Sequence, residues 1–444
     1  MRKNSAQFIL SKKLLATCFL GLFLILCIAA SVNADTAVRN KARQLELGAK
    51  LYNDANLSLN ADQSCATCHN PNPKGSLVVG SFIDDRLPVV ALTSHVPPWP
   101  TAVPPPVSQG SDPDLFGGRN TPSSAYAAFS PAFRFDEVAG LYVGGQFWDG
   151  REMSLAGQAA GPFRNPVEMA MVDKSAVVSA LQADRRYRRL FAAAYQDENG
   201  VPFDLGSVDT FSNQGALEAY DLMAKAIGEF EKTQLFNKFN SKYDYFLAGQ
   251  GTLTADEKKG LKLFEGKAKC ALCHISQASI APNGGPMPPL FTDYTYDNLG
   301  VPTNAYIDIL KPDTAPQPAD LGLGGVLDDP AQDGKFKVMS LRNIEITAPY
   351  AHNGVFQTLE EIVHFYNTRD VLGICPTDNM DPGFGVTCWP APEVRANMNV
   401  AELGDLSLSA KQEQRIVLFL KTLTDRDLTD FPSVFDAAAF PPMP

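Results

Sequence analysis

The sequence predicts an all-α fold in which two similar helical domains follow one another and carry long loops. Three observations support this prediction. The pattern Gly-x-Lys-Leu-aromatic occurs at 48–52 and again at 260–264, each time shortly before a pair of cysteines. Capping-box pairs precede amphipathic runs in the second half of the chain. The stretch 86–118 is rich in proline and has no helical period, so we expect it to be a loop.

The first 34 residues differ in composition from the rest. Four basic residues precede an apolar run, and a small-residue site ends at Ala34. This pattern predicts a secretory signal peptide over residues 1–34. The alternative is an uncleaved membrane anchor, because the run approaches transmembrane length. No later stretch is apolar enough to span a bilayer, so we expect a protein without stable membrane insertion after cleavage, in the periplasm or on the outer cell surface.

The charge of the mature chain limits its partners. Without residues 1–34 the chain has 34 basic and 49 acidic residues, a net charge of −15. Such a balance argues against a nucleic-acid partner. It is compatible with a basic protein partner, although acidic surfaces also serve solubility alone.

Two copies of the motif Cys-x-x-Cys-His carry the strongest chemical signal. They consist of Cys65, Cys68 and His69, and of Cys270, Cys273 and His274. This motif attaches c-type haem, because two thiols add across the porphyrin vinyl groups and the histidine binds the iron. A redox dithiol and half of a zinc site are the alternatives. Two copies that both end in histidine, in an exported chain with five histidines, predict two covalently bound haem c groups.

Helices are expected around both motifs. Each Gly-x-Lys-Leu-aromatic pattern lies on a helix that leads into a haem loop. Thr254 and Glu257 form a capping box at the start of the second such helix. Ser409 and Gln412 have the same relation before a closing helix, and 216–232 is its counterpart in the first half.

This repeated arrangement predicts two cytochrome-c-like haem domains in tandem. We place the N-terminal domain at 35–245 and the C-terminal domain at 246–444. Each is about twice as long as a small haem domain requires, so long loops carry the excess.

A further amphipathic helix is predicted in the segment 351–370. Thr358 and Glu361 have capping-box spacing, so the helix should begin at Leu359. One apolar stripe at i, i+3, i+4 and i+7 consists of Leu359, Ile362, Val363 and Tyr366. Tyr366 should therefore face inward, and His364, on the opposite side of the helix, should face solvent.

Two cysteines remain outside the haem motifs and the signal peptide. Cys375 and Cys388 bound a loop rich in proline and glycine. In an exported protein such a pair is expected to form a disulfide. Two buried free thiols are the alternative.

Several motifs agree, in order, with one family. Besides the two haem motifs, "RNTP", "FWDGR", "GPFRNPVEM" and "LRNIEITAPYAHNG" resemble the bacterial dihaem cytochrome c peroxidase/MauG superfamily. The resemblance covers the mature chain apart from the loops 86–118 and 370–400. It implies a haem-dependent oxidoreductase that reacts with hydrogen peroxide.

The resemblance also implies roles around the first haem. Glu168 would be the catalytic carboxyl group that moves a proton between the peroxide oxygens. Gln158 and Pro162 would shape the same pocket, and Trp148 would lie between the haems and relay oxidising equivalents. Without the resemblance, Glu168 and Gln158 read as surface residues and Trp148 as a core tryptophan.

One calcium ion between the haems is implied as well, with Asn120, Thr347 and Pro349 as its ligands. No acidic EF-hand loop supports it independently. Peroxidase members of the family also have a histidine that blocks the first iron until reduction. The spare histidine here, His95, lies further downstream than that position, so we expect an iron that is open without reductive activation.

The ligand of the second iron distinguishes branches of the family. Tyr366 stands fourteen residues after His352. Peroxidase members have the iron-binding methionine at this position, and the MauG branch has tyrosine. The resemblance therefore implies His274 and Tyr366 as ligands, with His352 in a structural role. A core tyrosine, with Met287 or Met339 on the iron, is the alternative.

The ligand identity favours one function among three. An anionic phenolate favours ferric and higher oxidation states, whereas a thioether raises the potential. We therefore expect a MauG-like enzyme that stores oxidising equivalents on both haems and oxidises residues of a partner protein, tryptophan above all. The alternatives are a peroxidase that takes electrons from a small cytochrome or cupredoxin, and a non-enzymatic electron carrier. Trp99 and Trp389 are candidate exit points for oxidising equivalents, or packed residues.

Overall fold

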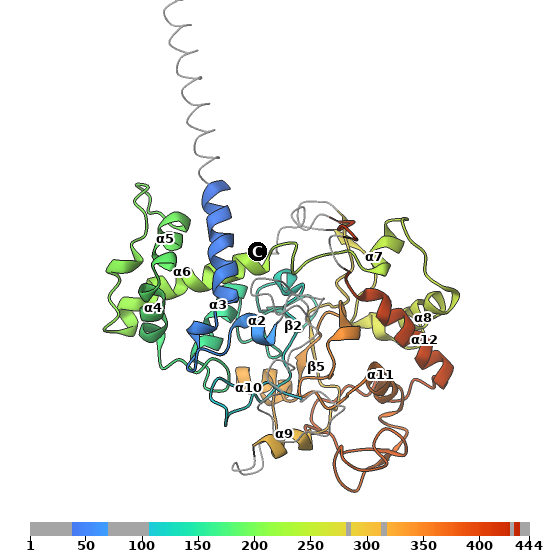
Figure 1. Ribbon diagram of the computed structural model, residues 1–444. Helices are drawn as coiled ribbons and strands as arrows, with labels where there is room; N and C mark the ends of the chain where they lie inside the picture. The colour runs from blue at the N-terminus through green and yellow to red at the C-terminus, as the bar shows by residue number, and fades with distance from the viewer. Residues whose placement is uncertain (1–37, 70–105, 281–285, 312–317, 427–429, 436–444) are drawn as a thin grey trace, which may run out of the picture.

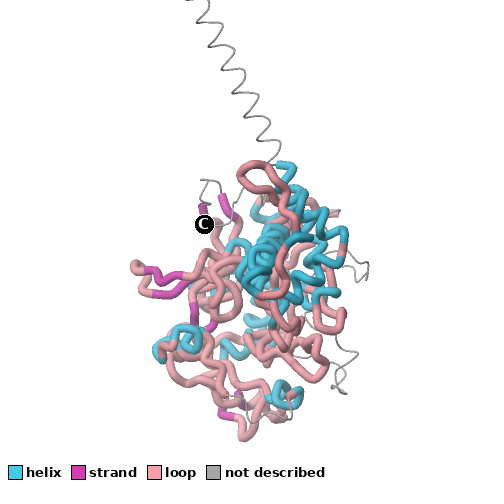
Figure 2. The backbone as a smooth tube through the Cα atoms, turned by 90° about the vertical axis from the view of Figure 1, so that its left-hand side faces the viewer, coloured by secondary structure: helices cyan, strands magenta, loops and turns pink. Residues whose placement is uncertain are grey.

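The computed structural model describes residues 38–69, 106–280, 286–311, 318–426 and 430–435. The predicted signal peptide, His95, Trp99 and most of the loop 86–118 lie outside them. Regular structure in this part of the chain is mainly helical, with four two-stranded sheets, so the all-α prediction is right for the larger elements only (Figure 1). Long loops connect the helices (Figure 2). None of the described helices combines the length and apolar character that crossing a membrane requires.

The helices and strands are short. After a first helix over residues 38–52, the helices are α2 (Cys65–Cys68), α3 (Leu155–Ala160), α4 (Lys174–Ala183), α5 (Arg185–Ala194), α6 (Asn213–Glu231), α7 (Lys242–Leu247), α8 (Ala255–Glu265), α9 (Ala305–Leu310), α10 (Leu323–Leu327), α11 (Leu359–Thr368) and α12 (Ala410–Leu420). The antiparallel pairs are β1 (Arg134–Asp136) with β2 (Leu141–Val143), β3 (Ser279–Ile280) with β4 (Pro286–Met287), and β5 (Tyr296–Asp297) with β6 (Phe336–Lys337). The parallel pair is β7 (Gly373–Ile374) with β8 (Cys388–Trp389).

The predicted helix starts are confirmed. Capping boxes at Thr254, Thr358 and Ser409 open α8, α11 and α12. In each, the cap side chain and the residue three positions later satisfy backbone N–H groups that the first turn leaves without partners. The expected helix at 216–232 is α6, which begins three residues earlier.

The repeated glycines mark two equivalent helix crossings. Gly48, in the first helix, lies where that helix crosses α6, and a Cβ atom on it would overlap the carbonyl oxygen of Ala226. One turn later, Tyr52 meets Phe230 edge-on, with ring centroids 5.6 Å apart. Only glycine permits such a close backbone approach.

The second crossing repeats these contacts between α8 and α12. A Cβ atom on Gly260 would overlap the carbonyl oxygen of Arg415. Phe264 meets Phe419 edge-on, with ring centroids 5.2 Å apart. The two Gly-x-Lys-Leu-aromatic patterns therefore have the same packing role in the two halves of the chain.

Each crossing belongs to its own hydrophobic cluster. The first cluster spans residues 47–236 and the second spans residues 243–423. Tyr243 of α7 already packs in the second cluster, against Phe291 and Phe419. The functional cavity described below lies between the two clusters.

A buried polar network joins the two halves. Arg342 forms an ion pair with Asp244, with 2.9 Å between Nη2 and Oδ1, and both side chains are almost fully buried. The Tyr126 hydroxyl donates to Asp425 at 2.9 Å, and Asn343 donates to the same carboxylate. Buried charges are costly unless they are paired in this way, so the network fixes how the halves face each other.

A disulfide joins Cys375 and Cys388, and both residues are buried. The adjacent Trp389 is also buried. Its indole Nε1 donates to Thr368 Oγ1 at 3.0 Å, and its ring meets Phe365 edge-on at 5.2 Å. The loop is thereby fastened to α11, the helix that carries Tyr366.

Replacing Cys375 and Cys388 together with serine is expected to lower the free energy of unfolding by about 3 kcal/mol, because the disulfide closes a loop of roughly 15 residues in the unfolded chain. Denaturant unfolding of the oxidised wild type and the double variant measures this difference. Equal unfolding midpoints would show that the disulfide does not stabilise the fold.

Candidate functional site

One cavity of about 660 Å³ lies between the two clusters. It is lined by both cysteine pairs and both motif histidines, namely Cys65, Cys68, His69, Cys270, Cys273 and His274. Helix α2 carries the first pair, and a short 3-10 helix (Cys270–Leu272) begins the second motif. None of these four cysteines is in a disulfide. The structure thus brings two motifs that are about 200 positions apart to one interior space.

The four thiols are free, and burial keeps them protonated. Burial raises the pKa of the Cys68 thiol to about 11, helped by the nearby charge of Glu168. Burial also raises the pKa of Cys270 and that of Cys273 to about 12 each. The thiols are therefore protonated at neutral pH in the absence of haem.

Both motif histidines are neutral imidazoles. Burial lowers the pKa of His69 and that of His274 to about 4 each. The Nδ1 atom of His274 lies 2.8 Å from the carbonyl oxygen of Phe291, which leaves Nε2 for the cavity. A neutral imidazole oriented by a hydrogen bond through its other nitrogen is the usual form of a metal-binding histidine.

Tyr366 of α11 lines the same cavity, as its place in the apolar stripe predicts. Burial raises the pKa of its phenol above the ordinary value. The neighbouring Phe365 points the other way, into the core beside Trp389. The phenol oxygen therefore belongs to the wall of the site that also holds His274.

The prediction that His364 faces solvent is wrong. Its side chain is only 32% exposed, and its Nδ1 atom lies 2.9 Å from Glu413 Oε1 of α12. The helical period correctly turns His364 away from the cavity, but α12 covers that side of α11.

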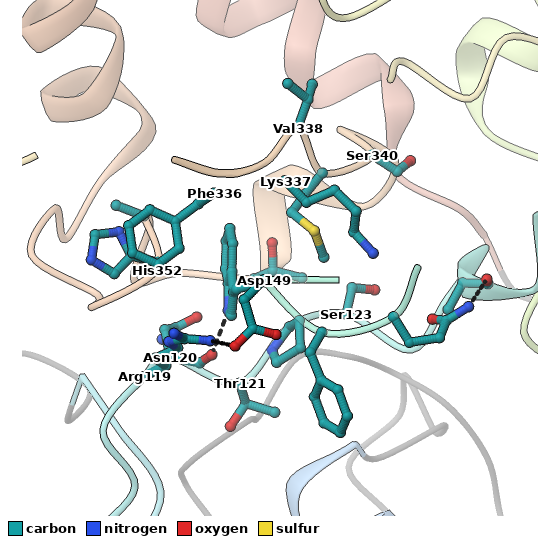
Figure 3. Close-up of a pocket in the computed structure, with 18 of the residues that line it drawn as sticks. Arg119, Asn120, Thr121, Ser123, Asp149, Phe336, Lys337, Val338, Ser340 and His352 are labelled. Carbon is teal, nitrogen blue, oxygen red and sulfur yellow. Dashed lines mark hydrogen bonds and ion pairs between the residues drawn. The ribbon is translucent and has the colours of Figure 1, made fainter. Parts of the chain in front are cut away.

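The two methionines considered as alternative ligands of the second iron differ in position. Met339 lines the cavity, whereas Met287 does not and packs beside a separate cluster around Tyr126 and Phe239. His352 also lines the cavity and is buried. Its ring is stacked on Phe336 with 3.6 Å between centroids, as Figure 3 shows.

The residues expected at the first haem also line the cavity. Gln158 lies on α3, while Pro162 and Glu168 belong to the segment that follows it. Burial raises the pKa of the Glu168 carboxyl, while the charge of Arg151 and a hydrogen bond from Asn165 lower it, so that the net shift is upward. A carboxyl group with a raised pKa, lining the cavity beside the first haem motif, is a candidate for proton transfer.

Trp148 lies in the wall shared by the two halves. Its Nε1 atom donates to the carbonyl oxygen of Asn120 at 2.9 Å, and its own carbonyl oxygen accepts from the backbone N–H of Lys337. Asn120 belongs to the first half of the chain and Lys337 to the second. Trp148 is therefore held by hydrogen bonds to both halves.

The three residues expected to bind calcium all line the cavity: Asn120, Thr347 and Pro349. The Asn120 amide nitrogen donates to the carbonyl oxygen of Pro106 at 2.9 Å, which turns its carboxamide oxygen away from that contact. This side-chain oxygen and the backbone carbonyls of the other two are the neutral oxygen ligands that calcium accepts.

An ionic chain around Asp149 was missed by the sequence analysis. Arg119 donates to Asp149 at 2.6 Å, as Figure 3 shows. Arg119 also donates to Asp320 at 2.6 Å, and Arg151 Nη1 lies 2.8 Å from Asp149. Lys337 also lines the cavity and is buried. Burial lowers the pKa of its ammonium group to about 7, and the negative charge of Asp149 raises it only in part. These cations fit a cavity for haem, which carries carboxylates that must be balanced when buried.

Glu231, at the end of α6, was also missed, because nothing in the sequence marks it. It is buried, lines the cavity, and its Oε2 atom has no hydrogen-bond partner among the described residues. Burial raises the pKa of its carboxyl to about 8.

Between about pH 4.5 and pH 8 the folded chain keeps the Glu231 proton that the unfolded chain loses. The free energy of unfolding should therefore fall as pH rises through this window, by up to about 1.4 kcal/mol for each pH unit. In Glu231→Gln this contribution should be absent. Denaturant unfolding at pH 5 and pH 8 compares the two proteins, and the same pH dependence in both would rule out this role of Glu231.

Thiol pairs, neutral imidazoles and a cation-bearing cavity between two helical clusters define a dihaem protein of the c type. The comparisons agree with this class. A family model described as di-haem cytochrome c peroxidase matches residues 42–252. The chain belongs to the dihaem cytochrome c peroxidase/MauG family and is a haem-dependent oxidoreductase of the peroxidase type.

Individual relatives support both branches of the family. The chain is 37% identical over 413 residues to the methylamine utilization protein MauG of Paracoccus denitrificans, which covers 91% of this chain and 94% of that one. It is 30% identical over 326 residues to the cytochrome c551 peroxidase of Pseudomonas aeruginosa, covering 72% and 70%. Among solved structures, the diheme peroxidase BthA of Burkholderia thailandensis has a TM-score of 0.67 and 26% identity, with 90% of each chain covered.

Proposed function

We propose that the protein uses hydrogen peroxide to oxidise residues of a partner protein, tryptophan above all. Cys65, Cys68 and His69 would hold the haem that supplies peroxide reduction, and Cys270, Cys273 and His274 would hold a second haem, so that the pair would supply storage of oxidising equivalents for oxidation of the partner. The observation that carries the proposal is Tyr366, which faces the cavity from α11 where a conventional peroxidase of this family has methionine.

When bound, the haems supply redox-active iron for peroxide reduction and for holding oxidising equivalents. The residues of the chain manage protons and position. Glu168, with its raised pKa, takes the proton from one peroxide oxygen and returns it to the other. Gln158 narrows the pocket beside it, and Trp148 lies between the haem sites as a relay.

Tyr366 and His274 are proposed as the two ligands of the second iron. Burial keeps the free phenol protonated, so binding the metal must displace its proton. The resulting phenolate favours high oxidation states, which suits storage better than uptake of electrons from a cytochrome.

Three further assignments accompany this proposal. The chain is exported to the periplasm, with the outer cell surface as an alternative. One calcium ion is held by Asn120, Thr347 and Pro349. The halves are two cytochrome-c-like domains, and the packing of Tyr243 supports a border just before α7 rather than at residue 245.

A conventional cytochrome c peroxidase is the second candidate, because the cytochrome c551 peroxidase of P. aeruginosa is among the relatives. The third candidate, a non-enzymatic electron carrier, is disfavoured because the chain belongs to a family of peroxidases.

Mixing the holoprotein with peroxide, first without a donor and then with reduced cytochrome c, separates these functions. We expect the absorption of both haems to change without a donor and to return slowly, and cytochrome c to be oxidised slowly. Rapid turnover of cytochrome c would favour the conventional peroxidase instead.

A further inference from the structure

A hairpin formed by β1 and β2 stands out from the body of the protein (Figure 2). Its apolar side chains are exposed: 43% for Phe135, 99% for Val138 and 44% for Leu141. An ion pair between Arg134 and Asp136 cancels part of the charge beside them. The hairpin therefore presents three exposed apolar side chains that the fold itself does not cover, with the exposed carboxylate of Glu137 beside Val138.

Aromatic rings lead inward from this hairpin. The Tyr142 ring contacts Phe135 at 4.9 Å and is stacked on Phe133 with 5.5 Å between centroids. Phe133 in turn meets Tyr296 edge-on at 5.9 Å. The rings form an unbroken series from the exposed tip to a buried tyrosine.

The inner end of the series is linked to the backbone of Trp148 through Lys337. Tyr296 is paired with Lys337 in the sheet of β5 and β6, and the backbone N–H of Lys337 donates to the carbonyl oxygen of Trp148. The Tyr296 hydroxyl also packs against Gly150, where a Cβ atom would overlap it. The series thus joins the wall between the two haem sites to the protein surface.

We propose that Tyr142 is the residue through which electrons leave the protein substrate, and that the apolar hairpin is the surface on which a tryptophan-bearing segment of that substrate docks. This inference rests on the proposed function, because peroxide supplies the oxidant. Of the two tryptophans expected as exits, Trp99 lies outside the described residues, and Trp389 is buried and hydrogen-bonded in the core of the second half.

The proton requirement selects Tyr142 over Tyr296. A tyrosine that loses an electron also loses its phenolic proton, and the hydroxyl of Tyr296 donates to the carbonyl oxygen of Gly144, which cannot keep a proton. Burial and the charge of Asp149 raise the pKa of Tyr296 further. Tyr142 is only half-buried, so its proton can pass to water.

The electron balance is complete with peroxide as the oxidant. One peroxide accepts two electrons and two protons and becomes two waters. Each electron passes from Tyr142 towards the haem pair across the rings of Phe133 and Tyr296, which are not themselves oxidised, and the Tyr142 proton goes to solvent. The tyrosyl then recovers one electron and one proton from the substrate indole. Two such transfers per peroxide oxidise the substrate by two electrons.

A short synthetic peptide with one tryptophan between leucines serves as the probe, and the holoprotein with peroxide as the oxidant. We expect Tyr142→Phe to lose peptide oxidation while the haem absorption changes as in the wild type. Val138→Asp, at a fully exposed tip, should raise the half-saturating peptide concentration several-fold and leave the maximal rate unchanged. Tyr306→Phe, a tyrosine on α9 outside the ring series, is the matched control.

Wild-type peptide oxidation by Tyr142→Phe would overturn Tyr142 as the exit, and an unchanged half-saturating concentration in Val138→Asp would overturn the hairpin as the docking surface. If peroxide does not change the haem absorption of any of these proteins, the proposed function fails, and the inference fails with it.

Discussion

Replacing Tyr366 with methionine is expected to raise the reduction potential of the second haem by on the order of hundreds of millivolts and to abolish storage of oxidising equivalents there. The neutral thioether stabilises ferrous iron, whereas the phenolate stabilises higher oxidation states. The variant should then oxidise reduced cytochrome c faster than the wild type. In effect, one side chain would convert the storage site into a site that receives electrons.

Spectroelectrochemistry of the holoprotein measures the potential, and stopped-flow absorption measures the cytochrome c reaction. Met339→Leu is the matched control, because Met339 lines the same cavity and is the alternative ligand. If Met339→Leu moves the potential and Tyr366→Met does not, the ligand assignment is wrong.

Replacing Glu168 with glutamine is expected to slow the reaction with peroxide by about 10²- to 10⁴-fold, the range for loss of a general acid–base. Glutamine keeps the size of the side chain but cannot accept the peroxide proton. In the wild type the rate should fall as pH falls through the pKa of Glu168, which burial raises above the ordinary glutamate value. The variant should lack this pH dependence.

The second-order rate of the absorption change after mixing with peroxide, measured from acid to neutral pH, provides the comparison. Glu152→Gln is the matched control, since Glu152 lies six residues before Gln158 but does not line the cavity. A rate in Glu168→Gln equal to that of the wild type would exclude Glu168 as the proton-transfer group.

Local signals made part of this structure predictable. Capping boxes define where α8, α11 and α12 begin, because both partners lie within four residues. The helical period placed Tyr366 on the cavity side of α11. The recurrence of one glycine pattern predicted two equivalent helices that lead into the haem motifs, and the structure adds that each of them crosses another helix at its glycine.

Contacts between distant residues were not predictable. Arg119 and Asp320 are 201 positions apart, and no period or spacing links them. Lys337 and Glu231 read as ordinary charged residues, since burial in the cavity depends on the whole fold. His364 was misplaced for a related reason, because the helical period cannot show that α12 covers the outer side of α11.

The central claim is that the first iron is open while Tyr366 binds the second. Electron paramagnetic resonance of the resting holoprotein, recorded before and after peroxide without a donor, tests it most directly. We expect one high-spin and one low-spin ferric signal at rest, and both should decrease after peroxide. Two low-spin signals that peroxide leaves unchanged would contradict the account.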